Sequence, residues 1–113
     1  MRNLKKENLF KGKKFNVSRH HFKISDKKIS HEIIEQNPAS AVLAIEKDCV
    51  IMVKQFRYPF DEALEIPAGI KNKNETSIDC AKREFLEETG YRCSNLKLLT
   101  RYYPFLGYNT QYI

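Results

Sequence analysis

The sequence predicts a mixed α/β domain, because short strand patterns fill the first part of the chain and one strong helix pattern follows them. The chain has 113 residues, a length that suits one domain, and 42% of them are hydrophobic, which is enough for a buried core. No internal repeat, low-complexity tract or linker divides it. We therefore expect a single domain over residues 1–113, in which the basic residues 1–12 form a segment that can be flexible.

The strand patterns are short stretches that alternate apolar and polar residues or concentrate β-branched ones. They span residues 13–17, 21–24, 29–35, 41–46, 49–55, 63–66 and 96–102. A polar break at residues 18–20 separates the first two. Lys47 and Asp48 form so short a polar link between two later segments that a hairpin is predicted there. Residues 67–69 are expected to turn the chain toward the helix.

One helix is predicted in the second half of residues 69–91. Thr76 or Ser77 can cap its first turn through a side-chain oxygen, and Gly90 can end it in a left-handed conformation that costs glycine little. A helical spacing also brings apolar residues to one face that can be buried. These residues are Ile78, Ala81 and Phe85.

Three carboxylates share a neighbouring arc of this helix. At about 100° per residue, Glu84, Glu87 and Glu88 fall within roughly 100°. Neighbours about 6 Å apart repel by roughly 3 kcal/mol at an effective dielectric near 20, and a bound divalent cation reverses that sign. Mg²⁺ takes carboxylate oxygens and keeps waters or substrate phosphates as its other ligands. The alternative interpretation of three such glutamates is an acidic, solvated helix face.

The wider pattern over residues 69–91 decides between these interpretations, because it resembles the Nudix box of the Nudix hydrolase family. The box places glycine, glutamate, Arg-Glu, an apolar residue, Glu-Glu, glycine and an apolar residue at fixed spacings, and every fixed position is filled here. The matching residues are Gly69, Glu75, Arg83, Glu84, Phe85, Glu87, Glu88, Gly90 and Tyr91. The resemblance implies an α/β/α sandwich with a mixed sheet and the box helix.

The resemblance also implies the roles of individual residues. Glu84, Glu87 and Glu88 would hold Mg²⁺ or Mn²⁺, and the backbone carbonyl near Ala68 or Gly69 could reach a metal as well. Glu75 and Arg83 would pair and brace the loop against the helix. The catalytic residues implied by the box are therefore Glu75, Arg83, Glu84, Glu87 and Glu88.

Residues 10–15, 51–59 and 64–69 resemble the ADP-ribose pyrophosphatase branch of the family. In that branch the arginine of the Gln-aromatic-Arg segment helps to hold the pyrophosphate, which points to Arg57; a surface salt bridge is the alternative. Glu65 would touch the ribose or a metal, or have only a structural role at a strand end, and Gly69 would border the substrate.

The implied reaction is metal-dependent hydrolysis of a nucleoside diphosphate conjugate. ADP-ribose or another ADP- or NDP-sugar would give AMP or NMP and a sugar phosphate, and no general base can be assigned. The implied partner is this small molecule, together with a possible second copy bound through the N-terminal strands. The alternatives are an inactive remnant or a nucleotide-binding regulatory module and, with less support, a basic nucleic-acid-binding protein.

Two departures from the branch are visible near the end of the sequence. Phe105, Leu106 and Gln111 replace its Ser, Pro and acidic residues, which weakens the case for ADP-ribose over related conjugates. Tyr102, Tyr103 and Tyr108 could stack on a base or be ordinary core and rim aromatics. The chain stops where the family continues, so we expect a C-terminally truncated domain.

Charge and cysteine content bound the setting. The net charge is +6, and residues 1–28 hold ten of the 20 Lys and Arg with only Glu7 and Asp26 as acids. Such a segment could contact nucleic acid or raise the local concentration of an anionic nucleotide. We favour a solubilising surface, and the segment lacks the interleaved arginine and aromatic repeats that would strengthen the nucleic-acid case. Cys49, Cys80 and Cys93 have no metal-site spacing and indicate free thiols in the cytoplasm. No apolar run reaches the length of about 18 residues that a membrane span needs.

Overall fold

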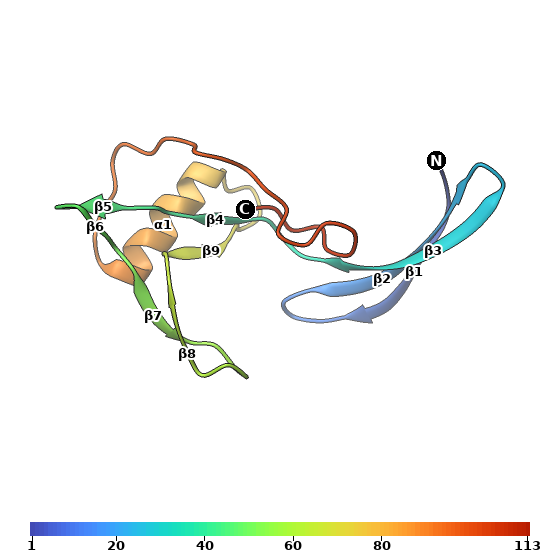
Figure 1. Ribbon diagram of the computed structural model, residues 1–113, viewed down its shortest axis with the longest axis horizontal. Coiled ribbons are helices and arrows are strands. Elements are labelled where there is room, and N and C mark those ends of the chain that lie inside the picture. The colour runs from blue at the N-terminus through green and yellow to red at the C-terminus, as the bar shows by residue number, and fades with distance from the viewer. The chain divides into compact units, whose positions relative to one another are not determined.

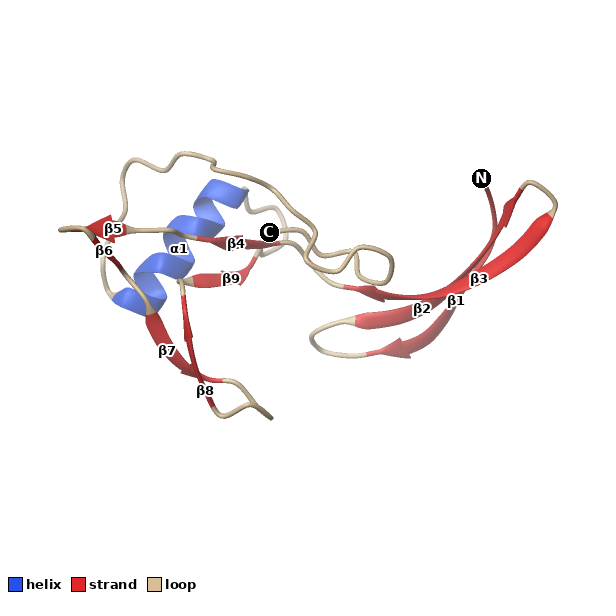
Figure 2. Ribbon diagram, viewed as in Figure 1, coloured by secondary structure: helices blue, strands red, loops and turns tan.

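The computed structural model describes all residues, 1–113, and divides into two compact units. Unit 1 comprises Met1–Pro38 and Arg101–Ile113, and unit 2 comprises Ala39–Thr100. The mixed α/β class is confirmed, because strands in both units accompany one helix (Figure 2). That one domain spans the whole chain stays a prediction.

Unit 1 is built on an antiparallel sheet in the order β1-β2-β3 (Figure 1). Its strands are β1 (Arg2–Lys11), β2 (Asn16–Ile24) and β3 (Lys27–Glu35). Most of the basic segment 1–12, for which the sequence allows flexibility, belongs to a ten-residue strand that pairs with β2 from end to end. Backbone hydrogen bonds to β2 hold this segment in place, and composition alone does not reveal such pairing.

Strand β2 runs through the polar break that the sequence predicts at residues 18–20, so that expectation is wrong. Ser18 is fully buried, and its hydroxyl donates to the Glu35 Oε1 on β3 at 2.9 Å. The same hydroxyl lies 2.8 Å from the His20 Nε2. Because these partners lie across the sheet or two residues along the strand, the polar side chains are satisfied without a break in the ladder.

The C-terminal segment of unit 1 pairs with the end of β3. The Ile34 N–H donates to the Tyr108 carbonyl at 2.7 Å, and the Thr110 N–H donates to the Ile34 carbonyl at 3.0 Å. The strand expected over residues 96–102 is not formed, and only Tyr102 exchanges backbone hydrogen bonds, with Ile113. Residues 96–101 have no strand beside them, and an apolar pattern cannot make a strand without a partner.

Unit 2 contains six short strands in three antiparallel pairs, β4 with β9, β5 with β6 and β7 with β8. Their bounds are β4 (Ala39–Ala41), β5 (Ile45–Glu46), β6 (Cys49–Val50), β7 (Val53–Phe56), β8 (Glu62–Glu65) and β9 (Ala68–Ile70). The hairpin predicted around Lys47 and Asp48 is confirmed, and both residues adopt positive φ angles in its turn. The predicted turn at 67–69 is wrong, because Ala68 and Gly69 belong to β9.

Helix α1 (Ser77–Thr89) confirms the predicted helix and its caps. The Thr76 side chain accepts a hydrogen bond from the Asp79 N–H at 3.1 Å, which satisfies a donor of the first turn. Gly90 has a φ of 75°, in the left-handed region, and its N–H donates to the Leu86 carbonyl. This helix is neither long nor apolar enough to cross a membrane.

The core of unit 2 forms where α1 packs on β4 and β9 (Figure 1). Val42, Ala81 and Phe85 are its buried apolar residues. Ile78, expected on the buried face, is 55% exposed, and Cys80 is buried in its place. The Cys80 thiol lies against β9 and donates to the Gly69 carbonyl at 3.6 Å, so the strand covers Cys80, which follows Ile78 by two residues.

Candidate functional site

The site is assembled from β9, the loop that follows it and the outer edge of α1. The loop folds back because the Glu75 N–H donates to the Asn72 carbonyl, and the Asn72 N–H donates to the Glu75 carboxylate at 2.8 Å. Asn74 has a φ of 64°, a conformation that asparagine tolerates better than most residues. The result is a compact turn that aims the Glu75 side chain at the helix.

Arg83 receives that carboxylate in a bidentate pair. Its Nε donates to the Glu75 Oε1 at 2.7 Å and its Nη2 to the Glu75 Oε2 at 3.0 Å. The Nη2 also donates to the Ile70 carbonyl at the end of β9. The hydrogen bonds from Arg83 lower the pKa of Glu75 to about 2. The guanidinium therefore links strand, loop and helix, and the contact expected between Glu75 and Arg83 is present.

Glu84 lies between Arg83 and the strand. Its Oε1 accepts from the Arg83 Nη1 at 2.6 Å. Its carboxylate also occupies the space beside Gly69, where an added Cβ would lie 1.9 Å from the Glu84 Cδ. Only glycine at this position leaves room for the carboxylate as it stands. The structure therefore gives Gly69 a steric role, while contact of Gly69 with substrate stays a prediction.

Glu88 is held by two neutral donors. Its Oε1 accepts from the Gln55 Nε2 on β7 at 2.7 Å, and its Oε2 accepts from the Ala68 N–H on β9 at 3.0 Å. The Ala68 amide thus binds a carboxylate, while contact of a metal with a carbonyl near Ala68 or Gly69 stays a prediction. Gln55 was missed by the sequence reasoning, although it stands two residues before Arg57 in a segment that the sequence analysis singled out.

Glu87 points outward from the same helix edge. Its side chain is 59% exposed, and its Oε2 lies 3.4 Å from the Arg83 Nη1. The acidic and thiol side chains of the chain form no group of three or more that could hold a metal ion as they stand. Glu84 and Glu88 are each directed to nitrogen donors, so the expected convergence of three carboxylates is not present in this structure.

The donor set nevertheless fits a divalent cation in kind. Glu84, Glu87 and Glu88 supply hard carboxylate oxygens from one helix edge, which are the ligands that Mg²⁺ and Mn²⁺ prefer. Arg83 places positive charge beside Glu84 and Glu87. The position of the guanidinium beside these carboxylates indicates that their negative potential favours a positive charge there.

Arg57 and Glu65 contact each other across the β7–β8 hairpin, as in the salt-bridge alternative for Arg57, and contact of either residue with substrate stays a prediction. The Arg57 Nε and Nη2 donate to the Glu65 Oε2 at 3.0 and 2.7 Å. The hydrogen bonds that Arg57 donates to Glu65 raise the pKa of Arg57. Both side chains are partly exposed, and ion pairs of this kind contribute between about 0 and 1 kcal/mol. Separation of the Arg57–Glu65 pair therefore costs little free energy.

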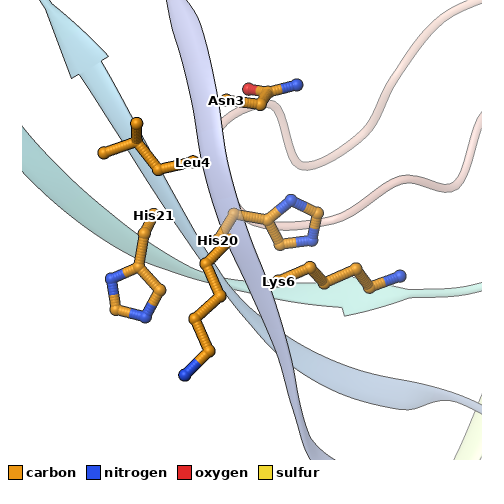
Figure 3. A pocket seen from close by; sticks show the side chains of 6 residues that line it. Asn3, Leu4, Lys6, His20 and His21 are labelled. Atoms are coloured by element: carbon orange, nitrogen blue, oxygen red, sulfur yellow. The ribbon is translucent and has the colours of Figure 1, made fainter.

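A separate pocket of about 310 Å³ lies in unit 1 (Figure 3). Its lining residues come from β1 and β2 and are Asn3, Leu4, Lys5, Lys6, His20 and His21. Figure 3 shows the His20 and His21 rings pointing away from each other, as consecutive residues of a strand must. The His21 Nε2 contacts Glu7 at 3.0 Å, so its polar atom is already partnered.

Two of the three tyrosines considered for base stacking, Tyr103 and Tyr108, contact other aromatic rings of unit 1. Tyr103 packs edge-on against Tyr112 with 5.9 Å between ring centroids, and Phe105 packs against Tyr108 at 5.8 Å. The Arg101 guanidinium lies 4.8 Å from the Tyr112 ring. These contacts favour the interpretation of ordinary packing aromatics over a stacking platform.

The sequence also matches known proteins. The NUDIX domain model matches residues 35–113. An ADP-ribose pyrophosphatase from Bacillus subtilis (strain 168) is 39% identical over 106 residues, which are 91% of this chain and 57% of that protein. A methanol dehydrogenase activator from Bacillus methanolicus is 37% identical over 84 residues, 73% of this chain and 45% of that protein. The chain thus spans about half the length of these curated relatives.

A solved structure shows the same fold. The crystal structure of an ADP compounds hydrolase matches with a TM-score of 0.86 at 20% sequence identity. The match covers 97% of this chain and 62% of that protein. At this identity the likeness concerns the fold, and it includes both units of the chain.

Proposed function

Because the chain belongs to the Nudix family, we propose that it carries the metal-binding and catalytic segment of a pyrophosphohydrolase. The proposed substrate is a nucleoside diphosphate joined to a second group, with ADP-ribose or another ADP-sugar as the first choice. The name of the Bacillus subtilis relative supports this choice. In the reaction a water oxygen forms a bond to one phosphorus, the bridging P–O bond breaks, and ADP-ribose gives AMP and ribose 5-phosphate.

The observation that carries the proposal is the arrangement of Glu84 and Glu88 on one edge of α1. They lie one turn apart, and each is fixed by a different donor, Glu84 by Arg83 and Glu88 by Gln55 and the Ala68 amide. Two oriented carboxylates on one edge suit a divalent ion and repel each other without one. An acidic face that served only solubility would leave both side chains in water, as Glu87 is.

Glu84, Glu87 and Glu88 would hold the Mg²⁺ or Mn²⁺, together with a main-chain carbonyl near Ala68 or Gly69. When bound, the metal supplies positive charge for the phosphate oxygens and a bound water of lowered pKa. The rest of the work falls to the chain itself. Arg83 and Glu75 keep the loop on the helix, and Gly69 keeps β9 close to the carboxylates.

Arg57 is proposed to bind the pyrophosphate. Its Nε and Nη2 already reach the two oxygens of one carboxylate, Glu65 Oε1 at 3.2 Å and Oε2 at 2.7 Å, and phosphate oxygens offer a similar geometry with more charge. Glu65 would then be released toward the ribose or toward the metal. In the absence of substrate, the weak and partly exposed ion pair with Glu65 would keep the Arg57 side chain oriented.

A second candidate is a nucleotide-binding regulatory module without turnover. One relative is named for the activation of another enzyme, which supports keeping this possibility. The two functions differ in product formation. A regulatory module would bind ADP-ribose with the same carboxylates in place and release no AMP.

The deciding experiment measures AMP release by the 113-residue chain, with and without Mg²⁺, from ADP-ribose and a panel of other nucleoside diphosphate conjugates. Glu84→Gln and Glu88→Gln should each abolish Mg²⁺-dependent release and retain the circular dichroism spectrum. Glu46→Gln, in the exposed strand β5, is the matched control and should release AMP at the wild-type rate. Full activity of either Gln variant at the site would refute the assignment.

Two further proposals concern the setting of the protein. We propose a homodimer that forms through the N-terminal strands, since β1 is paired on one side only and leaves a free edge. Light scattering on the purified chain would give a monomer mass if this is wrong. We also propose a cytoplasmic location, which the three free cysteines support.

A further inference from the structure

We propose that Gln55 is a positioning residue that orients the Glu88 carboxylate for a divalent cation, an inference that rests on the proposed function. The Gln55 Nε2 donates to one oxygen of Glu88 at 2.7 Å, and the Ala68 N–H donates to the other at 3.0 Å. The two donors come from different strands, β7 and β9. Together they fix both the direction and the plane of the carboxylate.

The character of these donors separates Glu88 from its neighbour. Glu84 is bound by the positively charged Arg83, which neutralises it locally. Glu88 is bound by an amide side chain and a backbone amide, and neither carries charge. Each carboxylate oxygen can accept about two hydrogen bonds, so one accepting direction remains free on each oxygen of Glu88. Glu88 is therefore oriented while its charge stays available, which is the state that a metal ligand requires.

The position of Gln55 follows from the pattern of β7. Along this strand Val53 and Gln55 are half-buried, whereas Lys54 and Phe56 are exposed. The alternation directs residue 55 to the face on which α1 lies, and pairing of Gln55 with Ala63 on β8 fixes its height along that face. An exposed polar side chain would serve solubility, but this amide is partly buried and aimed at one acceptor.

Gln55→Ala and Gln55→Met both test the proposal. The alanine variant removes the side chain, and the methionine variant keeps its length and bulk but has no N–H donor. Gln36→Ala is the matched control, because it also removes a hydrogen-bonded glutamine side chain, whose Oε1 accepts from the Asn109 Nδ2 in unit 1. Circular dichroism melting curves establish that all three variants fold.

The first measurement needs no metal. The Ala68 amide is followed by ¹H–¹⁵N correlation spectroscopy and by hydrogen exchange in the metal-free chain. Loss of the Gln55 donor frees Glu88 to move, so the Ala68 resonance should shift and its N–H should exchange faster in both Gln55 variants. The Gln36 control should leave that resonance unchanged. An unchanged Ala68 amide in Gln55→Met would overturn the proposal.

The second measurement is Mn²⁺ binding by titration calorimetry, with the ion alone as ligand. Loss of an outer partner of a metal ligand costs on the order of 10- to 100-fold in metal affinity, and we expect a loss in that range for both Gln55 variants. In turnover with ADP-ribose, kcat should fall while KM for the nucleotide stays close to the wild-type value. A wild-type Kd for Mn²⁺ in Gln55→Met would overturn the role of Gln55 and leave the proposed function standing. Absence of Mn²⁺ uptake by the wild-type chain would overturn both.

Discussion

Gly69→Ala is expected to destabilise the wild-type chain and to stabilise a chain that lacks the Glu84 carboxylate. In the wild type, the new Cβ would lie 1.9 Å from the Glu84 Cδ and 2.2 Å from both carboxylate oxygens, whereas real Cβ atoms stay beyond 3.0 Å. The flexible end of Glu84 must therefore swing away. It then loses its 2.6 Å hydrogen bond to Arg83. Hydrogen bonds to charged groups contribute about 1.5–3 kcal/mol to stability. Because this pair is partly exposed, we expect its loss to cost about 1–2 kcal/mol of the free energy of unfolding.

The sign reverses in a Glu84→Ala background. Gly69 does not have a positive φ, so alanine fits the backbone there, and removal of glycine stiffens the unfolded chain by about 0.4–1 kcal/mol. Urea unfolding followed by circular dichroism gives the four free energies of the double-mutant cycle. The glycine term is common to both backgrounds and cancels, so the expected coupling is the lost hydrogen bond, about 1–2 kcal/mol. A coupling below about 0.5 kcal/mol would refute the steric account of Gly69.

Three other perturbations follow from contacts already described. Arg83 lowers the pKa of the Glu75 carboxyl to about 2, so this carboxyl stabilises the fold above its unfolded pKa of about 4.3 and loses that effect as the pH falls toward 2. In acid-unfolding curves, the stability advantage of the wild type over Glu75→Gln should therefore shrink across this pH window. A constant difference in stability would contradict the pairing. Arg57→Ala should raise KM for ADP-ribose on the order of tenfold with little change in kcat, since one charge-assisted contact is lost from binding, and a change confined to kcat would refute the binding role. Phe85→Ala should cost about 3–5 kcal/mol in thermal unfolding, whereas Ile78→Ala should stay within about 0.5 kcal/mol; similar costs would mean that α1 packs with the face originally expected.

The helix and its caps could be predicted because their causes are local. Thr76 and Gly90 act on backbone groups within a few residues, so the spacing in the sequence contains the whole interaction. The box pattern likewise fixed the pairing of Glu75 with Arg83, since the loop is too short to place the glutamate far from the helix. The hairpin at Lys47 follows from the same kind of short-range constraint.

The remaining features depend on contacts between distant segments. The alternation along β7 places Gln55 on the half-buried face of the strand, but no local pattern encodes that Glu88 of α1 lies opposite that face. The burial of Cys80 in place of Ile78 depends on where β9 crosses the helix. The apolar run at 96–102 has strand composition, but composition cannot provide the neighbouring strand that pairing requires.

The three nitrogens of the Arg83 side chain bind two sets of partners, which has a consequence for the metal-free protein. Its Nε and Nη2 anchor the loop through Glu75 and Ile70, while its Nη1 alone serves Glu84 and Glu87. The Arg83 guanidinium is therefore a counterion whose Nη1 can leave Glu84 while its Nε and Nη2 stay bound to Glu75. Removal of divalent cations should therefore leave the protein folded, with Glu75 and Glu84 both paired to Arg83.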